Sequence, residues 1–194
     1  MGDLRRVALK NIDSVGRKIS ETLMNRLRNT VLKTKDGTII SLFYFTDAEF
    51  ENFTQGDIGF HFGTLDAAIN RENDPNRTKH GDKQIYKEVY INSENPIILE
   101  SDPMKWDAFS TAHLLLRQGI FTIEDLQALE KLEGFHNGKY GCEAVTELIR
   151  LINAKGYDGI IYTNGFEGGL SVIALYPDQI ITVAENGVLK KITV

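Results

Sequence analysis

The chain has 194 residues, of which 42% are hydrophobic and 25% are charged, and its formal net charge is −5. These values are typical of a globular protein with one sizeable core, and the negative charge disfavours a broad nucleic-acid-binding surface. The single cysteine, Cys142, excludes an intramolecular disulfide bond, and no cysteine–histidine cluster has zinc spacing. Because the sequence lacks a signal peptide and any apolar run that could span a membrane, we expect a cytoplasmic protein.

The beginning of the chain is predicted to form a basic amphipathic helix over residues 4–29. Its apolar positions recur at helical spacing: Ile12, Val15, Ile19, Leu23 and Leu27. We expect this helix to pack on the domain, and the alternative is that it docks on a partner or a membrane surface. The chain therefore divides into an N-terminal helix within residues 1–30 and a main domain over residues 31–194.

The first half of the main domain reads as strands joined by turns. Asp36-Gly37 indicates a hairpin turn before a strand over residues 38–46. Residues 59–62 form another predicted strand, and Thr64 is placed to cap the short helix that follows. A polar loop over residues 73–83 comes next.

The second half is predicted to hold a long strand, a helical block and further strands. The strand covers residues 84–100 with a bend near Asn95-Pro96, and three helices fill an insertion over residues 103–155. Two strands, "YDGIIYTN" and "LSVIALY", follow, and "ENG" suggests a final hairpin. Helices gathered in a block beside short strands predict the α+β class.

Two glycine-containing junctions are candidates for a ligand site. In "GFHFGT", strand alternation turns His61 away from the two flanking phenylalanines, toward either a cleft or solvent. Gly63 would let a ligand or a neighbouring strand approach the backbone, and the helix after Thr64 could attract an anion such as a pyrophosphate. In "NGFEGGLS", Glu167 is either a solvated turn residue or a catalytic carboxylate on a loop.

Several motifs, taken together and in order, resemble those of the ADP-ribosyltransferase domain found in phage and mobile-element polyvalent proteins. Such domains pair a "YHGT" strand with a segment of the type "GxHFGTxxAAxxR", a "YLxxxNPL" strand, a tryptophan-led helix and a segment "YDGIxYxNxxEGxxxSYIxFxPxQI". The corresponding stretches run from about residue 38 to residue 183: "FYFTDAEFENF", "GFHFGTLDAAINR", "VYINSENPIIL", "MKWDAF" and "YDGIIYTNGFEGGLSVIALYPDQI".

The resemblance implies an ADP-ribosyltransferase-like fold of two small packed sheets, rich in antiparallel strands, around a cleft for NAD. It implies an enzyme that cleaves the nicotinamide–ribose bond through an oxocarbenium-like transition state and passes ADP-ribose to a protein, a nucleic acid or water. Glu167 and Tyr44 are then the expected catalytic residues. The expected cofactor-binding residues are His61, Gly63, Thr64, Thr46, Tyr90 and Ser171.

The chain departs from the family pattern at three positions. Tyr44 and Phe45 stand where the family has the histidine and the glycine of "YHGT", and Ser171 stands where many ADP-ribosyltransferases carry the catalytic glutamate. Two main hypotheses follow. One is an active NAD-dependent transferase or glycohydrolase, as in an effector or toxin, and the other is a degenerate domain that binds a nucleotide or a protein without turnover. A third is a structural phage or mobile-element protein that docks through its N-terminal helix.

Overall fold

A computed structural model describes residues 7–49, 53, 57–100, 102–103, 105–138 and 141–183, together with the backbone of residues 190–191. The helices are α1 (Glu21–Arg26), α2 (Leu65–Asn73), α3 (Ala108–Arg117), α4 (Ile123–Leu129), α5 (Glu143–Ala154) and the short 3-10 helix η2 (Pro177–Gln179). The strands are β1 (Leu42–Thr46), β2 (Phe60–Gly63), β3 (Ile85–Ile91), β4 (Ile97–Leu99), β5 (Gly159–Thr163), β6 (Leu170–Ala174), β7 (Ile180–Thr182) and β8 (Lys190–Lys191). The predicted α+β class is confirmed.

The described strands form one mixed sheet in the order β4-β5-β6-β2-β1-β3-β7-β8. The join at its centre is narrow, because β1 and β2 pair only through Phe43 and Gly63. By contrast, β2 pairs with β6 along its whole length, and β1 does the same with β3. The sheet therefore consists of two four-stranded halves that diverge on either side of one residue pair. We expected two small sheets, and here the two halves remain hydrogen-bonded to each other.

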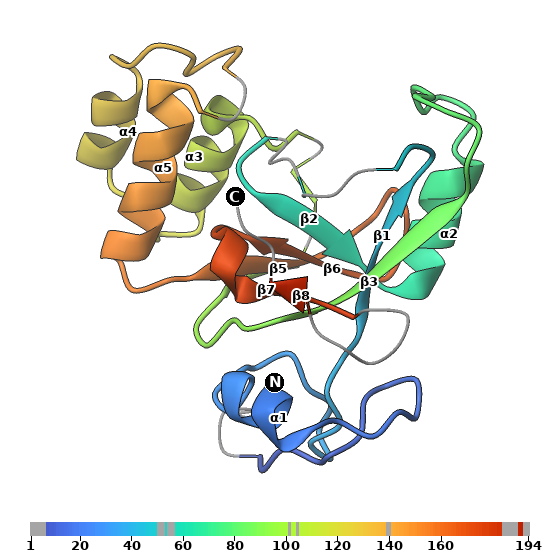
Figure 1. Cartoon of the computed structure of the whole chain (residues 1–194). Helices are drawn as coiled ribbons and strands as arrows, with labels where there is room; N and C mark the ends of the chain where they lie inside the picture. Colours follow the sequence, from blue (N-terminus) through green and yellow to red (C-terminus); the bar gives the residue numbers. More distant parts are fainter. Residues whose placement is uncertain are drawn as a thin grey trace.

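The two halves pack against each other around a shared apolar core. Phe60, Phe62 and Val172 from one half meet Leu42 and Val89 from the other. Because side chains alternate along a strand, neighbouring residues of these strands face the opposite side of the sheet, where they join two further apolar clusters. Ile160 and Ile173 pack there against α3–α5, and Tyr90 and Ile181 pack near α1. Figure 1 shows the three helices gathered on one side of the sheet, α2 on another and α1 near its base.

The prediction of a helix over residues 4–29 is wrong for residues 7–20 and 27–29, and residues 1–6 lie outside the described residues. Only α1 is helical, and Ser20 caps it by accepting a hydrogen bond from the Leu23 backbone N–H at 3.3 Å. Before it, the buried Asp13 carboxylate accepts from the backbone N–H groups of Val15 and Arg17 and closes a turn. Such side-chain bonds compete with helix formation, and Gly16 with φ of +86° completes the turn.

The strand predicted over residues 84–100 is divided into β3 and β4, which lie in different halves of the sheet. The Asp158 carboxylate causes the break, since it accepts from the backbone N–H of Glu94 at 2.6 Å and of Asn95 at 3.1 Å. The strand predicted over residues 38–46 begins only at Leu42, after the Asp36-Gly37 turn. The turn of the predicted final hairpin, "ENG", lies outside the described residues. None of the described helices combines the length and apolar composition needed to cross a membrane.

Candidate active site

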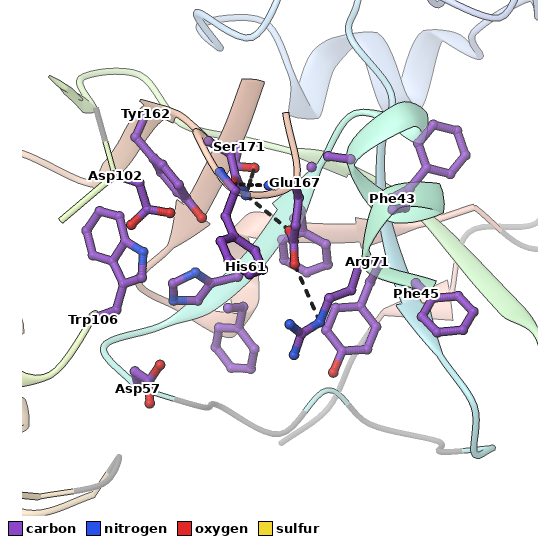
Figure 2. Close-up of a pocket in the computed structure, with 18 of the residues that line it drawn as sticks. Phe43, Phe45, Asp57, His61, Arg71, Asp102, Trp106, Tyr162, Glu167 and Ser171 are labelled. Carbon is purple, nitrogen blue, oxygen red and sulfur yellow. Dashed lines mark hydrogen bonds and ion pairs between the residues drawn. The ribbon is translucent and has the colours of Figure 1, made fainter. Parts of the chain in front are cut away.

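A cavity of about 870 Å³ opens where β1 and β2 diverge. Its walls come from both halves of the sheet, from α2 and from the loop between β5 and β6. Figure 2 shows Glu167 and Arg71 pointing toward each other across this space, with His61 and Trp106 on the other side of Glu167. Of the sequence-predicted site residues, those that line the cavity are Tyr44, Thr46, His61, Gly63, Glu167 and Ser171.

Asn164 shapes the loop that carries Glu167. Its side-chain oxygen accepts from the backbone N–H groups of Phe166 at 3.1 Å and Glu167 at 2.8 Å. Its side-chain nitrogen donates to the Glu167 carboxylate at 3.1 Å and to the Ser171 hydroxyl at 3.2 Å. From α2, Asn70 donates to the Glu167 carbonyl at 2.6 Å. The loop is therefore held from two sides, and Asn164 also holds the carboxylate itself.

Gly169 allows this loop to rejoin the sheet, and its replacement by alanine is expected to disturb it. Its φ is +76°, and an added Cβ would lie 2.7 Å from the Thr64 hydroxyl oxygen. Gly169→Ala is expected to lower the free energy of unfolding by about 1–2 kcal/mol because of backbone strain and this overlap. Gly165→Ala in the same loop is the control, since an added Cβ there meets no heavy atom within 4 Å. Equal urea midpoints for the two variants would show that the loop does not require a glycine at position 169.

The half-buried Glu167 carboxylate has one cationic neighbour among the described residues, Arg71, whose Nε lies 3.4 Å from Oε1. Burial raises the pKa of Glu167, and the charge of Arg71 and the hydrogen bond from Asn164 reduce that rise without cancelling it. A carboxylate that is costly to keep ionised interacts favourably with a cation brought into the cavity. Glu167 can therefore stabilise positive charge or take up a proton.

His61 lines the cavity between two aromatic rings. Its ring centroid lies 5.7 Å from that of Trp106 and 6.5 Å from that of Tyr162. Burial lowers the pKa of His61 from 6.5 to about 4, so the imidazole is neutral near pH 7. Its Nε2 atom is buried and has no hydrogen-bond partner. The flanking Phe60 and Phe62 face the core, as strand alternation predicts.

The depressed pKa of His61 makes stability depend on pH in a defined window. The unfolded chain binds a proton at His61 with a pKa near 6.5, whereas the folded chain resists protonation down to about 4. The stability linked to neutral His61 is therefore complete above pH 6.5 and is lost as the pH falls toward 4. Relative to His61→Gln, the wild-type chain is expected to lose about 2–3 kcal/mol between pH 7 and pH 4.5, measured by urea unfolding. Parallel pH profiles of the two proteins would refute the burial of a neutral His61.

Tyr44 and His61 project from opposite faces of the sheet. Phe43 is opposite Gly63, so the next residue of β1, Tyr44, lies on the side of Phe62. Its ring contacts that of Phe62 with centroids 6.3 Å apart. Burial raises the pKa of Tyr44, so its hydroxyl stays protonated at neutral pH and can donate a hydrogen bond. The two residues reach the cavity from different directions and do not form one hydrogen-bonding unit.

Phe45 packs into the wall of the cavity instead of standing free within it. It is 8% exposed, its ring centroid lies 5.3 Å from that of Tyr86, and the Arg77 guanidinium lies 4.8 Å above it. Arg77 in turn pairs with Asp47 at 2.6 Å, and its Nε is buried without a partner. Arg77 and Arg71 line the cavity, although neither was among the predicted site residues. Arg77 lies in the polar loop, where no sequence motif marks it, and Arg71 is marked only as the last residue of "GFHFGTLDAAINR".

Two predicted cofactor-binding residues do not line the cavity. Tyr90 is buried beside the N-terminal segment and donates its hydroxyl to Asp13 at 2.5 Å. Thr64 caps α2, accepting from the Ala67 backbone N–H at 3.3 Å. Gly63 does line the cavity, and a Cβ there would lie 2.8 Å from the Ala67 Cβ, so close packing of α2 requires a glycine. We therefore assign structural roles to Tyr90 and Thr64 in place of the predicted cofactor-binding roles.

Comparisons with family models, curated proteins and solved structures found no match to the chain. In the described part of the chain, no group of three His, Cys, Asp or Glu side chains is arranged to hold a metal ion. The geometry of the cavity is therefore the guide to function.

Proposed function

We propose that this cavity binds NAD and that the protein transfers ADP-ribose from NAD to an acceptor or to water. The observation that carries the proposal is Glu167, a half-buried carboxylate with a raised pKa in a cavity of about 870 Å³. A cavity of this size is at the upper end of the range for small-molecule and cofactor sites. The sequence resemblance, which covers the same loop and the β2–α2 junction, supports the same activity.

The lining residues suit the parts of a dinucleotide. Arg71 and Arg77 supply cationic groups for a pyrophosphate, and the Arg77 Nε is a buried donor without a partner in the described structure. Trp106 and Tyr162 offer aromatic surface with ring centroids 4.7 Å apart. The two halves of the single sheet diverge around this cavity, and this arrangement supports the proposal.

The proposed chemistry is substitution at the ribose carbon that carries nicotinamide. The bond to the nicotinamide nitrogen breaks and its electron pair leaves with nicotinamide. An acceptor oxygen or nitrogen forms the new bond and releases a proton. Glu167 stabilises the positive charge that develops on the ribose, while Asn164 and Arg71 orient its carboxylate.

A second candidate function is nucleotide or protein binding without turnover. Tyr44 and Phe45 favour it, because they replace the histidine and glycine of the family pattern and bring bulk to β1. A single experiment separates the two functions. The protein is incubated with labelled NAD and a bacterial lysate, and both thermal stability and transferred label are measured.

The active function predicts NAD-dependent stabilisation, by about 2.7 kcal/mol at a hundredfold excess over the dissociation constant, together with label on an acceptor or free ADP-ribose. Stabilisation without any product would support the binding module. If NAD neither stabilises the protein nor yields product, both functions are excluded for this nucleotide.

A further inference from the structure

The polar loop over residues 74–83 forms one wall of the cavity, although it contains no helix or strand of its own. Three of its residues line the cavity: Arg77, Thr78 and His80. A loop without regular hydrogen bonding keeps one shape only where other contacts hold it. The contacts that fasten this loop to the end of β1 converge on Asp47, the residue that follows the strand.

Asp47 fastens the loop through both its side chain and its backbone. The carboxylate accepts from Arg77 Nη1 at 2.6 Å and from the His80 backbone N–H at 3.0 Å. The backbone carbonyl accepts from the Lys83 N–H at 3.0 Å. Between these points the loop lies directly on Asp47, because a Cβ added to Gly81 would lie 2.4 Å from the Asp47 carbonyl oxygen. The segment over residues 77–83 is therefore seated on one residue.

The ion pair between Asp47 and Arg77 is buried. The exposed fraction of the side chain is 5% for Asp47 and 9% for Arg77. The hydrogen bonds from Arg77 and from the His80 N–H lower the pKa of Asp47 to about 2, so the carboxylate is ionised at neutral pH. A charge-assisted contact of this kind fixes both side chains in one arrangement.

Asp47 and Phe45 together set the direction of the Arg77 guanidinium. Asp47 holds Nη1, and the guanidinium lies over the Phe45 ring, 4.8 Å from its centroid. Because a guanidinium is planar, these two contacts also orient its other N–H groups. One of them, Nε–H, is buried and has no hydrogen-bond partner in the described structure. A guanidinium can only donate, so the group that completes it must offer an oxygen lone pair, and an anionic oxygen suits it best.

We infer that Asp47 is a positioning residue, which holds Arg77 in the cavity wall so that the free N–H can bind an anionic oxygen of a ligand. The choice of a phosphate as that anion rests on the proposed function. Asp47 is itself an anion beside this position, so Coulomb repulsion alone predicts that its removal strengthens phosphate binding. Positioning predicts the opposite, because a released Arg77 side chain loses its fixed direction.

The experiment is titration calorimetry of inorganic pyrophosphate into the full chain and its variants. Asp47→Ala is expected to weaken pyrophosphate binding by about tenfold, the usual loss when a charge-assisted hydrogen bond is no longer presented to a ligand. Glu49→Ala is the matched control, because it also removes a carboxylate that pairs with this loop. Glu49 pairs with Lys83 at 2.6 Å, and its side chain is 75% exposed. Its removal should change binding by less than about twofold.

A double-mutant cycle tests whether Asp47 acts through Arg77. Arg77→Ala alone should weaken pyrophosphate binding at least as much as Asp47→Ala does, and the double variant should bind no more weakly than Arg77→Ala. Hydrogen exchange of the ligand-free protein gives a second readout. The His80 backbone N–H should exchange faster in Asp47→Ala than in the wild-type chain, and at the wild-type rate in Glu49→Ala.

The outcomes separate this inference from the proposed function. Tighter pyrophosphate binding in Asp47→Ala, equal changes in Asp47→Ala and Glu49→Ala, or additive losses in the cycle would each overturn the positioning role. A wild-type chain that does not bind pyrophosphate would overturn it as well. Binding that depends on Asp47, in a protein that never releases nicotinamide from NAD, would uphold the positioning role and refute the transfer reaction. If Asp47→Ala fails to fold, Asp47→Asn replaces it and should show a smaller loss in the same direction.

Discussion

Glu167→Gln is expected to lower the rate of nicotinamide release from NAD by a factor of about one hundred to one thousand. The substitution preserves the shape of the side chain and the hydrogen bond from Asn164, but it removes the negative charge. A single preorganised group that stabilises transition-state charge typically contributes this much to a rate. NAD binding, measured by thermal stabilisation, should change much less, because the pyrophosphate is held by Arg71 and Arg77 in our account.

Glu147→Gln serves as the matched control for that variant. Glu147 lies on α5, outside the cavity, and pairs with Arg150. Its release rate should equal that of the wild-type chain. If Glu167→Gln and Glu147→Gln release nicotinamide equally fast, Glu167 has no catalytic role, whatever the wild-type rate is.

Asp13→Ala is expected to destabilise the fold by about 3 kcal/mol, measured by urea unfolding. The Asp13 side chain is fully buried, pairs with Arg17 at 2.7 Å and accepts from the Tyr90 hydroxyl at 2.5 Å. Its removal leaves the Tyr90 hydroxyl and two backbone N–H groups without their partner. Burial acts to raise the pKa of Asp13, but the hydrogen bonds from Tyr90 and Arg17 outweigh it and hold the pKa below 3.8. The contribution is thus present at neutral pH and is lost as the pH falls below 3.8.

Asp36→Ala provides the comparison for Asp13→Ala. Asp36 pairs with Lys10 at 2.5 Å in the same part of the fold, but both side chains are more than half exposed. Exposed ion pairs contribute little, so this variant should unfold at nearly the wild-type urea concentration. Comparable losses for the two variants would show that the N-terminal segment is not anchored through Asp13.

The sequence predicts most accurately the elements whose signals lie in neighbouring residues, such as strand alternation and helix capping. The β2–α2 junction follows from alternation in "GFHF" and from the capping preference of Thr64, and both are present in the structure. The α+β class follows likewise from short strands beside a block of helices. These signals lie within a few residues of the element that they specify, and they need no knowledge of distant partners.

The residues whose positions the sequence did not predict are held by contacts between distant segments. Asp13 closes its turn while bonded to Tyr90, 77 positions away, and this partner made a helical pattern form an irregular segment. For the same reason Tyr90 faces the N-terminal segment and not the cleft. Arg77 enters the site because its loop folds back to Asp47, a pairing that no local pattern encodes. Phe45, which replaces the glycine of the family pattern, packs against that same arginine.

The central claim is that the cavity between the diverging halves of the sheet cleaves the nicotinamide–ribose bond of NAD. The most direct measurement is the time course of nicotinamide formed from NAD by the full chain, quantified by chromatography at several protein concentrations. Our account predicts a rate that is proportional to protein concentration and is nearly abolished in Glu167→Gln. Nicotinamide formation at the spontaneous rate, at every protein concentration and with or without lysate, would contradict it.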